Sequence, residues 1–291
     1  MLLHFVEEHE AALRLCAASG LKPACVQRHR FPDGEIKLCL PHPLPRRVVV
    51  LRTLDQPNEK LIELLLLART ARALGTEHLT LVAPYLAYMR QDMAFTPGEA
   101  VSQRIVGSFL ATLFDAVITV DPHLHRVATL HEAVPVAHAI VLTGAHVLAD
   151  LVALRRHNPL LVGPDAESQQ WVAVAAARHG FDFTVCSKVR SGDHSVEVVL
   201  PPVAVAGRNV VVLDDVVSTG HTVAAAARLL RTAGAASIDV AATHALFATA
   251  ALDLMRDAGV GEVWSTDCIQ HATNAASMAP GIAQALRTMA G

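Results

Sequence analysis

Two adjacent carboxylates followed by hydroxyl side chains stand out in the stretch Val210–Val223, which reads VVVLDDVVSTGHTV. An apolar run that ends in Asp214 and Asp215 and passes through a glycine into a helix-forming segment is typical of a parallel strand, its turn and the next helix. Ligands of open α/β sheets bind at the carboxyl ends of strands. Backbone N–H groups at a helix N-terminus attract phosphate. The stretch therefore predicts a binding site for a phosphorylated ligand.

The side chains of this stretch fall into two chemical groups. Hydroxyls that can donate hydrogen bonds to phosphate come from Ser218, Thr219 and Thr222. Gly220 lets the backbone approach a ligand closely. Asp214 and Asp215 repel phosphate and instead suit ribose hydroxyls, or a magnesium ion that bridges to them. The combination favours a sugar-phosphate cradle over the alternative, a capped helix whose preceding acids are simply solvated.

Two cations two residues apart, Lys188 and Arg190, form a second candidate site, with Gly192 beyond them. In an extended loop such residues point to the same side. Two cations that close over a transferring phosphoryl group stabilise the charge on its equatorial oxygens. The alternative interpretation is a solvated basic turn.

The N-terminal half offers groups that suit a nucleotide. In FPDGE, Phe31 can stack on an adenine, and Asp33 and Glu35 can accept hydrogen bonds from its exocyclic amine. Arg90 and Gln91 follow a predicted strand end, where a guanidinium can hold phosphate through two hydrogen bonds. Taken singly, FPDGE is better explained as a surface turn, and Arg90 is as compatible with a surface cation as with a phosphate ligand.

The chain has 16 histidines, so any single one is expected to be structural or exposed. The HLH pair, His123 and His125, suggests zinc, but no third ligand has metal-site spacing nearby. His123 follows a predicted strand end, and there a position facing a magnesium nucleotide is the favoured interpretation.

The elements that must position these groups alternate between strand and helix. Apolar strand candidates separated by amphipathic helices predict parallel sheets covered on both faces. Strands are expected at 47–53, 78–84, 116–121, 159–165, 182–186, 196–200, 209–215, 237–244 and 261–267. Helices are expected at 58–75, 100–114, 167–180, 220–234 and 248–259, with a further helix joining two halves near 138–160. We place the domains at 1–145 and 146–291.

Composition excludes several classes of protein. A chain of 291 residues with 52% hydrophobic and 18% charged residues is globular rather than disordered. The net charge of -3 does not suggest a nucleic-acid or acidic-membrane partner. Five scattered cysteines without a CxxC motif indicate reduced thiols and a cytoplasmic protein. The start of the chain does not read as a signal peptide, and the apolar runs are too short for a membrane helix.

The DDVVSTGHT stretch resembles the 5-phosphoribosyl diphosphate (PRPP) loop of type I phosphoribosyltransferase folds. Other stretches resemble, in family order, motifs of the ribose-phosphate diphosphokinases (PRPP synthetases), most closely the archaeal-type branch. These stretches are RFPDGE (30–35), PYLAYMRQD (84–92), FTPGEAVSQR (95–104), TVDPH (119–123), GPD (163–165) and SKVRSGD (187–193).

The resemblance implies two tandem phosphoribosyltransferase-like α/β domains, each a mainly parallel sheet flanked by helices. It also implies transfer of the diphosphoryl group of Mg-ATP to the 1-hydroxyl of ribose 5-phosphate, giving PRPP and AMP. The N-terminal domain is then the ATP side, completed by the Phe31–Glu35 loop of a neighbouring copy in a homo-oligomer that is at least a dimer. The implied ATP-binding residues are Phe31, Asp33, Glu35, Arg90, Gln91, Asp92 and His123.

The same resemblance assigns the remaining residues. Ribose 5-phosphate is bound in the C-terminal domain by Asp214, Asp215, Ser218, Thr219, Gly220, His221 and Thr222. Lys188 and Arg190 belong to a mobile catalytic loop, and His123 and Asp165 face Mg²⁺.

Two departures from the family pattern set further expectations. His221 stands where related loops carry glycine, and it is strained if that position needs a positive φ. Ser218 replaces an aspartate that is frequent outside the archaeal-type branch. Two other functions stay open from the sequence: a phosphoribosyltransferase that consumes PRPP, and a non-catalytic regulatory homologue that binds nucleotides.

Overall fold

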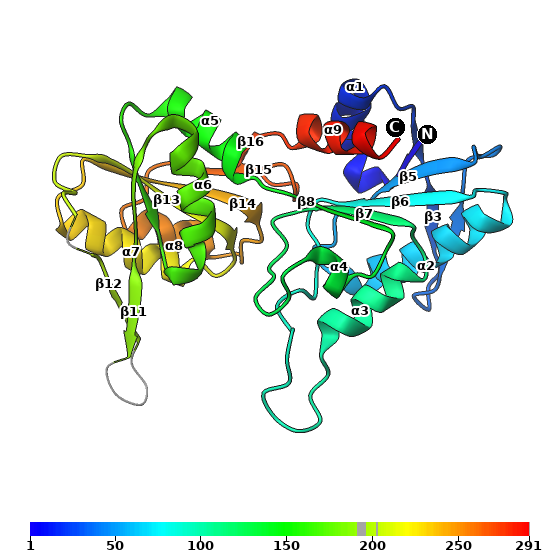
Figure 1. Cartoon of the computed structure of the whole chain (residues 1–291), viewed down its shortest axis with the longest axis horizontal. Helices are drawn as coiled ribbons and strands as arrows, with labels where there is room; N and C mark the ends of the chain where they lie inside the picture. Colours follow the sequence, from blue (N-terminus) through cyan, green and yellow to red (C-terminus); the bar gives the residue numbers. More distant parts are fainter. Residues whose placement is uncertain (191–195, 202, 291) are drawn as a thin grey trace. The chain divides into compact units, whose positions relative to one another are not determined.

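The computed structural model describes residues 1–190, 196–201 and 203–290, which form two compact units (Figure 1). Unit 1 contains Met1–Leu142 and the C-terminal segment that begins at Ala279, and unit 2 contains Thr143–Met278. The division therefore groups the last helix with the first unit, whereas the boundary placed at 145/146 from the sequence grouped it with the second.

Unit 1 is built on a six-stranded sheet in which every neighbouring pair is parallel. The strand order is β2-β1-β5-β6-β7-β8. The strands are β1 (Leu2–His4), β2 (Pro23–Cys25), β5 (Arg47–Leu51), β6 (His78–Ala83), β7 (Ala116–Val120) and β8 (His138–Leu142). β7 is buried along its whole length, as expected for a central parallel strand.

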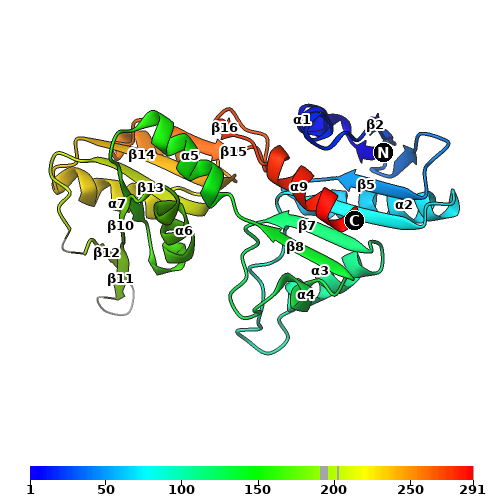
Figure 2. The ribbon, with the colours of Figure 1, turned by 45° about the horizontal axis from the view of Figure 1, so that its top comes forward.

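Helices cover both faces of this sheet (Figure 1). One face is covered by α2 (Pro57–Ala73), α3 (Ser102–Ala111) and α4 (Leu130–Ala133), whose apolar residues share one core with the sheet. The 3-10 turn η1 (Val6–Glu8), α1 (His9–Ser19) and α9 (Ala279–Ala290) complete the unit. α9 packs against α1 and β8 (Figure 2), and its Arg287 Nη1 donates to Ala18 O at 3.0 Å.

Unit 2 repeats this plan with the order β10-β9-β13-β14-β15-β16, again with parallel pairs throughout. Its strands are β9 (Leu160–Gly163), β10 (Asp182–Val185), β13 (Asn209–Val217), β14 (Ser237–Ala245), β15 (Val263–Thr266) and β16 (Asn274–Ala276). Its helices are α5 (Ala145–Arg155), η2 (Ala166–Ser168), α6 (Gln169–His179), α7 (His221–Thr232) and α8 (Ala251–Asp257).

The alternation of side chains along β13 explains the two layers of unit 2. Val210 and Val212 pack with α7 and α8 in one core cluster, whereas Val211 and Leu213 pack with α5 and α6 in another. A strand whose residues are apolar on both faces must lie between two layers of helices. The predicted α/β class with mainly parallel sheets is confirmed.

Each unit also carries a separate antiparallel hairpin, inserted between the second and third strands of its sheet. In unit 1 this hairpin is β3 (Gln27–Arg30) and β4 (Ile36–Cys39). In unit 2 it is β11 (Ser187–Arg190) and β12 (Val196–Val199), so the predicted strand 196–200 lies outside the main sheet. Across the described residues, no helix combines the length and the apolar character needed to cross a membrane.

Candidate functional sites of the two units

Three carboxylates gather where β9 and β13 end in unit 2. The two strands are neighbours and run parallel, so Asp165 after β9 lies at the same edge of the sheet as Asp214 and Asp215 in β13. Asp215 is buried and Asp214 half-buried. Burial, together with the charges of Asp215 and Asp165, raises the pKa of Asp214 well above its usual range. A cluster of this kind attracts cations and hydroxyl donors.

The residues Ser218–Gly220 connect this acidic edge to α7. Gly220 has φ 76°, a conformation that favours glycine, and a Cβ at this position would lie in tight contact with Ala251 O, at 3.2 Å. Ala248 N donates to Ser218 O at 3.0 Å and fixes the turn. The first amides of α7 have no partner within the helix, which makes the turn suitable for phosphate.

His221 begins α7 and is exposed. The left-handed conformation falls on Gly220, one residue earlier, and His221 is helical. The strain expected for a non-glycine residue at this position is therefore absent. Thr219 is exposed, and Ser218 and Thr222 are half-buried, so the hydroxyl residues of the predicted cradle lie together on one turn and the start of one helix.

Two loops of unit 1 follow the neighbouring strands β6 and β7 and contain backbone strain. Tyr88 (φ 67°) lies in the loop after β6, and Asp121 (φ 37°) directly follows β7. Non-glycine residues in the left-handed region cluster at ligand-binding and active sites. The pattern of residue types did not reveal this strain, because both positions look like ordinary loop residues in sequence.

The three predicted ATP-side residues after β6 differ in their surroundings. Arg90 and Gln91 are exposed and can reach a ligand. The side chain of Asp92 is only 2% exposed, and its Oδ1 accepts a hydrogen bond of 2.7 Å from Arg126 Nη1. The pair ties the loop after β6 to the loop after β7, which carries His123. Arg126 was not singled out from the sequence, since nothing local marks it as the partner of Asp92.

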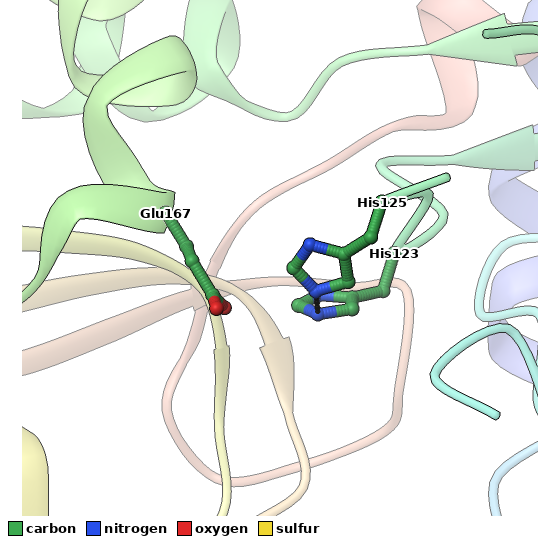
Figure 3. Close-up of side chains that lie close together, drawn as sticks. All are labelled: His123, His125 and Glu167. Atoms are coloured by element: carbon green, nitrogen blue, oxygen red, sulfur yellow. Dashed lines mark hydrogen bonds between the residues drawn. The ribbon is translucent and has the colours of Figure 1, made fainter. Parts of the chain in front are cut away.

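His123 and His125 lie in the loop after β7, and their rings meet edge to face with centroids 4.2 Å apart (Figure 3). Their Nε2 atoms are hydrogen-bonded to each other. His123 is half-buried and His125 exposed. Glu167, also drawn in Figure 3, belongs to unit 2, where its backbone N donates to Asp165 Oδ1 at 3.2 Å.

The tip of the β3–β4 hairpin exposes the residues of the FPDGE motif. Phe31 N donates to Glu35 O at 2.8 Å, and Gly34 N donates to Phe31 O at 3.0 Å. Asp33 Oδ1 accepts from Glu35 N at 3.1 Å. Phe31 is 38% exposed and packs edge to face on His29 at a centroid distance of 4.6 Å. An exposed aromatic ring flanked by acids is available to a planar, amine-bearing ligand.

Lys188 and Arg190 lie two residues apart on β11, where they are in register with Val198 and Val196 of β12. Their backbone is therefore extended, as the sequence analysis expected for two cations that point to the same side. Ser191, Gly192 and Asp193 of the SKVRSGD stretch lie outside the described residues.

Comparisons with known proteins cover nearly the whole chain. A family model described as the N-terminal domain of ribose phosphate pyrophosphokinase matches residues 1–113, and a phosphoribosyl transferase domain model matches residues 133–275. The ribose-phosphate pyrophosphokinase of Methanopyrus kandleri is 33% identical over 96% of this chain and 95% of its own. That of Halobacterium salinarum is 35% identical over 98% of this chain and 100% of its own.

A solved structure supports the fold. The crystal structure of phosphoribosylpyrophosphate synthetase from Mycobacterium smegmatis has a TM-score of 0.84 and 22% sequence identity, and the match covers 99% of this chain and 98% of that one. The two family models and the relatives of 33% and 35% identity show that the chain belongs to the ribose-phosphate pyrophosphokinase family.

Proposed function

We propose that this protein is a ribose-phosphate diphosphokinase, which transfers the diphosphoryl group of Mg-ATP to the 1-hydroxyl of ribose 5-phosphate and releases PRPP and AMP. The observation that carries the proposal is the likeness, at 33% identity over 96% of the chain, to an archaeal protein named ribose-phosphate pyrophosphokinase. The two units contain groups suited to the two substrates.

Ribose 5-phosphate binds to unit 2 in this proposal. Its phosphate is held by the amides at the start of α7 and by the hydroxyls of Ser218, Thr219 and Thr222, at the turn that Gly220 makes possible. The carboxylates of Asp214 and Asp215 accept hydrogen bonds from the ribose hydroxyls. The exposed imidazole of His221 lies at the same helix start, where it can reach the phosphate.

ATP binds to unit 1, within the N-terminal part of the chain that we assign to residues 1–145. Arg90 and Gln91 are exposed after β6 and hold the phosphates, with His123 from the loop after β7. Asp92 contributes through Arg126, to which it is bound. The adenine site is completed by Phe31, Asp33 and Glu35 of a second copy of the chain, so the active form is at least a dimer.

The donor set fits a magnesium ion. Asp165, Asp214 and Asp215 offer hard oxygen ligands. Burial, together with the charges of Asp215 and Asp165, raises the pKa of Asp214, a penalty that a divalent cation relieves. We assign Asp165 in unit 2 and His123 in unit 1 as the groups that face the metal. When bound there, Mg²⁺ would neutralise charge on the phosphate oxygens.

The chain positions two reactants and stabilises charge, and it forms no covalent intermediate. The anomeric oxygen of ribose 5-phosphate forms a bond to the β-phosphorus of ATP, and the bond from that phosphorus to the α,β-bridging oxygen breaks, which releases AMP. Lys188 and Arg190 on β11 meet the charge that develops on the transferred group.

The decisive experiment is incubation with ATP, MgCl₂ and ribose 5-phosphate. AMP and PRPP should form in equal amounts, and chelation of the metal should abolish both. ADP as the product would mean ordinary phosphoryl transfer and would refute the proposal. Release of diphosphate from PRPP that depends on a nucleobase would identify a phosphoribosyltransferase instead, and nucleotide binding without turnover would identify a regulatory homologue.

A further inference from the structure

The β3–β4 hairpin of unit 1 has little apolar attachment to the rest of its unit. Most of its residues are exposed, and it forms its own two-stranded sheet. Buried side chains occur at its base, at Val26 and Leu40, and Leu38 is partly buried against the core. Apolar burial is not directional and does not by itself fix the angle of such an arm.

Charged contacts join the outer part of the hairpin to α2. Arg28 and Arg30 are alternate residues of β3 and so lie on one face of the strand. Glu59 and Glu63 are four residues apart on α2 and so lie on one face of the helix. Arg28 Nη1 binds Glu63 Oε1, and its Nη2 binds Glu7 Oε1 of η1. Arg30 Nη2 binds Glu59 Oε1.

The spacing of the two elements makes a two-rung ladder possible. Two strand residues span about 7 Å, and four helix residues span about 6 Å. Each arginine can therefore meet its own glutamate without distortion of either element. The second rung lies next to Phe31, at the end of the strand that leads into the tip. Two rungs constrain the direction of the hairpin more than one rung does.

The inner rung is attached to a buried network. Glu63 is fully buried, and its second oxygen binds Arg52 Nη2. Arg52 is 1% exposed, donates to both oxygens of Glu8 at 2.7 and 2.8 Å, and stacks on the Phe5 ring at 4.4 Å. Because a buried carboxylate needs its partners, Glu63 cannot leave this position without a large penalty.

We propose that Glu59 and Glu63 are positioning residues that orient the β3–β4 hairpin, so that its Phe31–Glu35 tip is presented to the nucleotide bound by a second copy of this chain. The inference rests on the proposed function, since the ligand of the tip is ATP. Neither glutamate touches a substrate in this account, and both act through Arg28 and Arg30.

The outer rung provides the test, because Arg30 and Glu59 are exposed and their replacement does not threaten folding. The three variants are Arg30→Glu, Glu59→Arg and the double exchange. Each single variant should raise the KM for ATP about twofold to fivefold, as for the loss of an exposed ion pair. The KM for ribose 5-phosphate should stay unchanged, and the double exchange should restore the KM for ATP.

A matched control is available within unit 1. Arg46 and Glu77 form an exposed pair of the same type, joining the residue before β5 to the residue before β6. Arg46→Glu, Glu77→Arg and their double exchange should leave both KM values unchanged. Failure of the Arg30/Glu59 exchange to restore the KM for ATP would mean that Arg30 itself contacts the nucleotide, and would overturn the ladder.

A second measurement does not depend on activity. Spin labels on Lys37→Cys and Arg69→Cys, in a background with the exposed Cys25 and Cys39 replaced by serine, report the distance from hairpin to α2. Labelled chain is diluted with unlabelled chain. The distance distribution should broaden in Glu59→Arg and narrow again in the double exchange. An unchanged distribution would refute the inference even if PRPP is formed, whereas broadening without PRPP formation would refute the proposed function alone.

Discussion

The two six-stranded sheets share one strand order, yet residues of opposite charge stand near the ends of their third strands. In unit 2, β13 carries Asp214 and Asp215, at the proposed ribose site. In unit 1, β5 is followed by Arg52, which is buried and bound to Glu8 and Glu63. The same place in the topology thus holds a buried structural arginine in one unit and a pair of carboxylates in the other, so the fold alone does not decide where a ligand binds.

The turns that follow these strands sharpen the contrast. The residue before α2, Gln56, has φ 50°, and the residue before α7, Gly220, has φ 76°, so both helices begin after a left-handed residue. The first residue of α2 is Pro57, which has no N–H, whereas α7 begins with His221, which has one. Because an anion at a helix start is bound by free N–H groups, the turn in unit 2 offers one more such group to a phosphate than the turn in unit 1.

The two hairpins also differ in what their cationic side chains do. The unit 1 hairpin uses its arginines for attachment to α2, and its tip is aromatic and acidic. The unit 2 hairpin carries Lys188 and Arg190, which we propose to be catalytic. The first prediction tests this contrast with one lysine from each hairpin.

Lys188→Ala should lower kcat by about 10²–10³, the usual effect of losing one well-placed donor to a transition state. Since the interaction forms mainly in the transition state, kcat and kcat/KM should fall together, with nucleotide binding little changed. Lys37→Ala in β4 is the matched control and should keep most of its activity. Equal effects of the two substitutions in steady-state assays would remove the distinction between the hairpins.

The second prediction concerns the buried network of Arg52, Glu8 and Glu63, which lies after the third strand of unit 1. Burial raises the pKa of Glu8 to about 7, against the opposing effect of Arg52. Between pH 4.5 and 7, Glu8 therefore keeps its proton in the folded state but has lost it in the unfolded state. Glu8 should make unfolding easier as pH rises through this window, by about 3 kcal/mol at most, from 1.36 kcal/mol per pKa unit.

Glu8→Gln should remove this pH dependence, measured as the difference in unfolding free energy between pH 5 and pH 7.5. Glu7→Gln is the control. Hydrogen bonds and charge from Arg28 and the backbone outweigh burial and lower the pKa of Glu7, so its contribution is present above the unfolded pKa and disappears at more acidic pH. A steeper slope in Glu8→Gln than in the parent would contradict the assignment.

The smallest predicted effects compare the two left-handed turns. Gly220→Ala should destabilise unit 2 by about 1–2 kcal/mol, because an L-residue is strained at this φ, and the added Cβ meets Ala251 O. Gln56→Gly should stabilise unit 1 by up to about 1 kcal/mol, since glycine adopts the conformation without strain. Denaturation midpoints measure both, and a shift of the same sign in the two variants would break the comparison.

Local sequence pattern was enough for the fold class and for the elements next to the motifs. Apolar runs such as Val210–Leu213, followed by a glycine and an amphipathic segment, predict β13, its turn and α7 without knowledge of contacts. The strand continues to Val217, two residues beyond the predicted end, because Asp214 and Val216 remain in register with β14.

Contacts between distant residues were not predictable in this way. Asp92 and Arg126 are 34 residues apart, and the sequence gives no sign that one binds the other. Nor does it indicate the network around Arg52, whose members come from η1, β3 and α2. The strain expected at His221 depended on which residue of the turn is left-handed, and backbone geometry assigns that conformation to Gly220.

The position of α9 has a consequence for biosynthesis. Because α9 packs on α1 and β8, and Ile282 and Ala283 are buried, unit 1 has its full core only after the segment from Ala279 has been translated. Unit 2 is encoded without interruption from Thr143 to Met278 and is complete earlier. On the ribosome the second unit can therefore finish folding first, while the apolar surface of α1 waits for its partner helix.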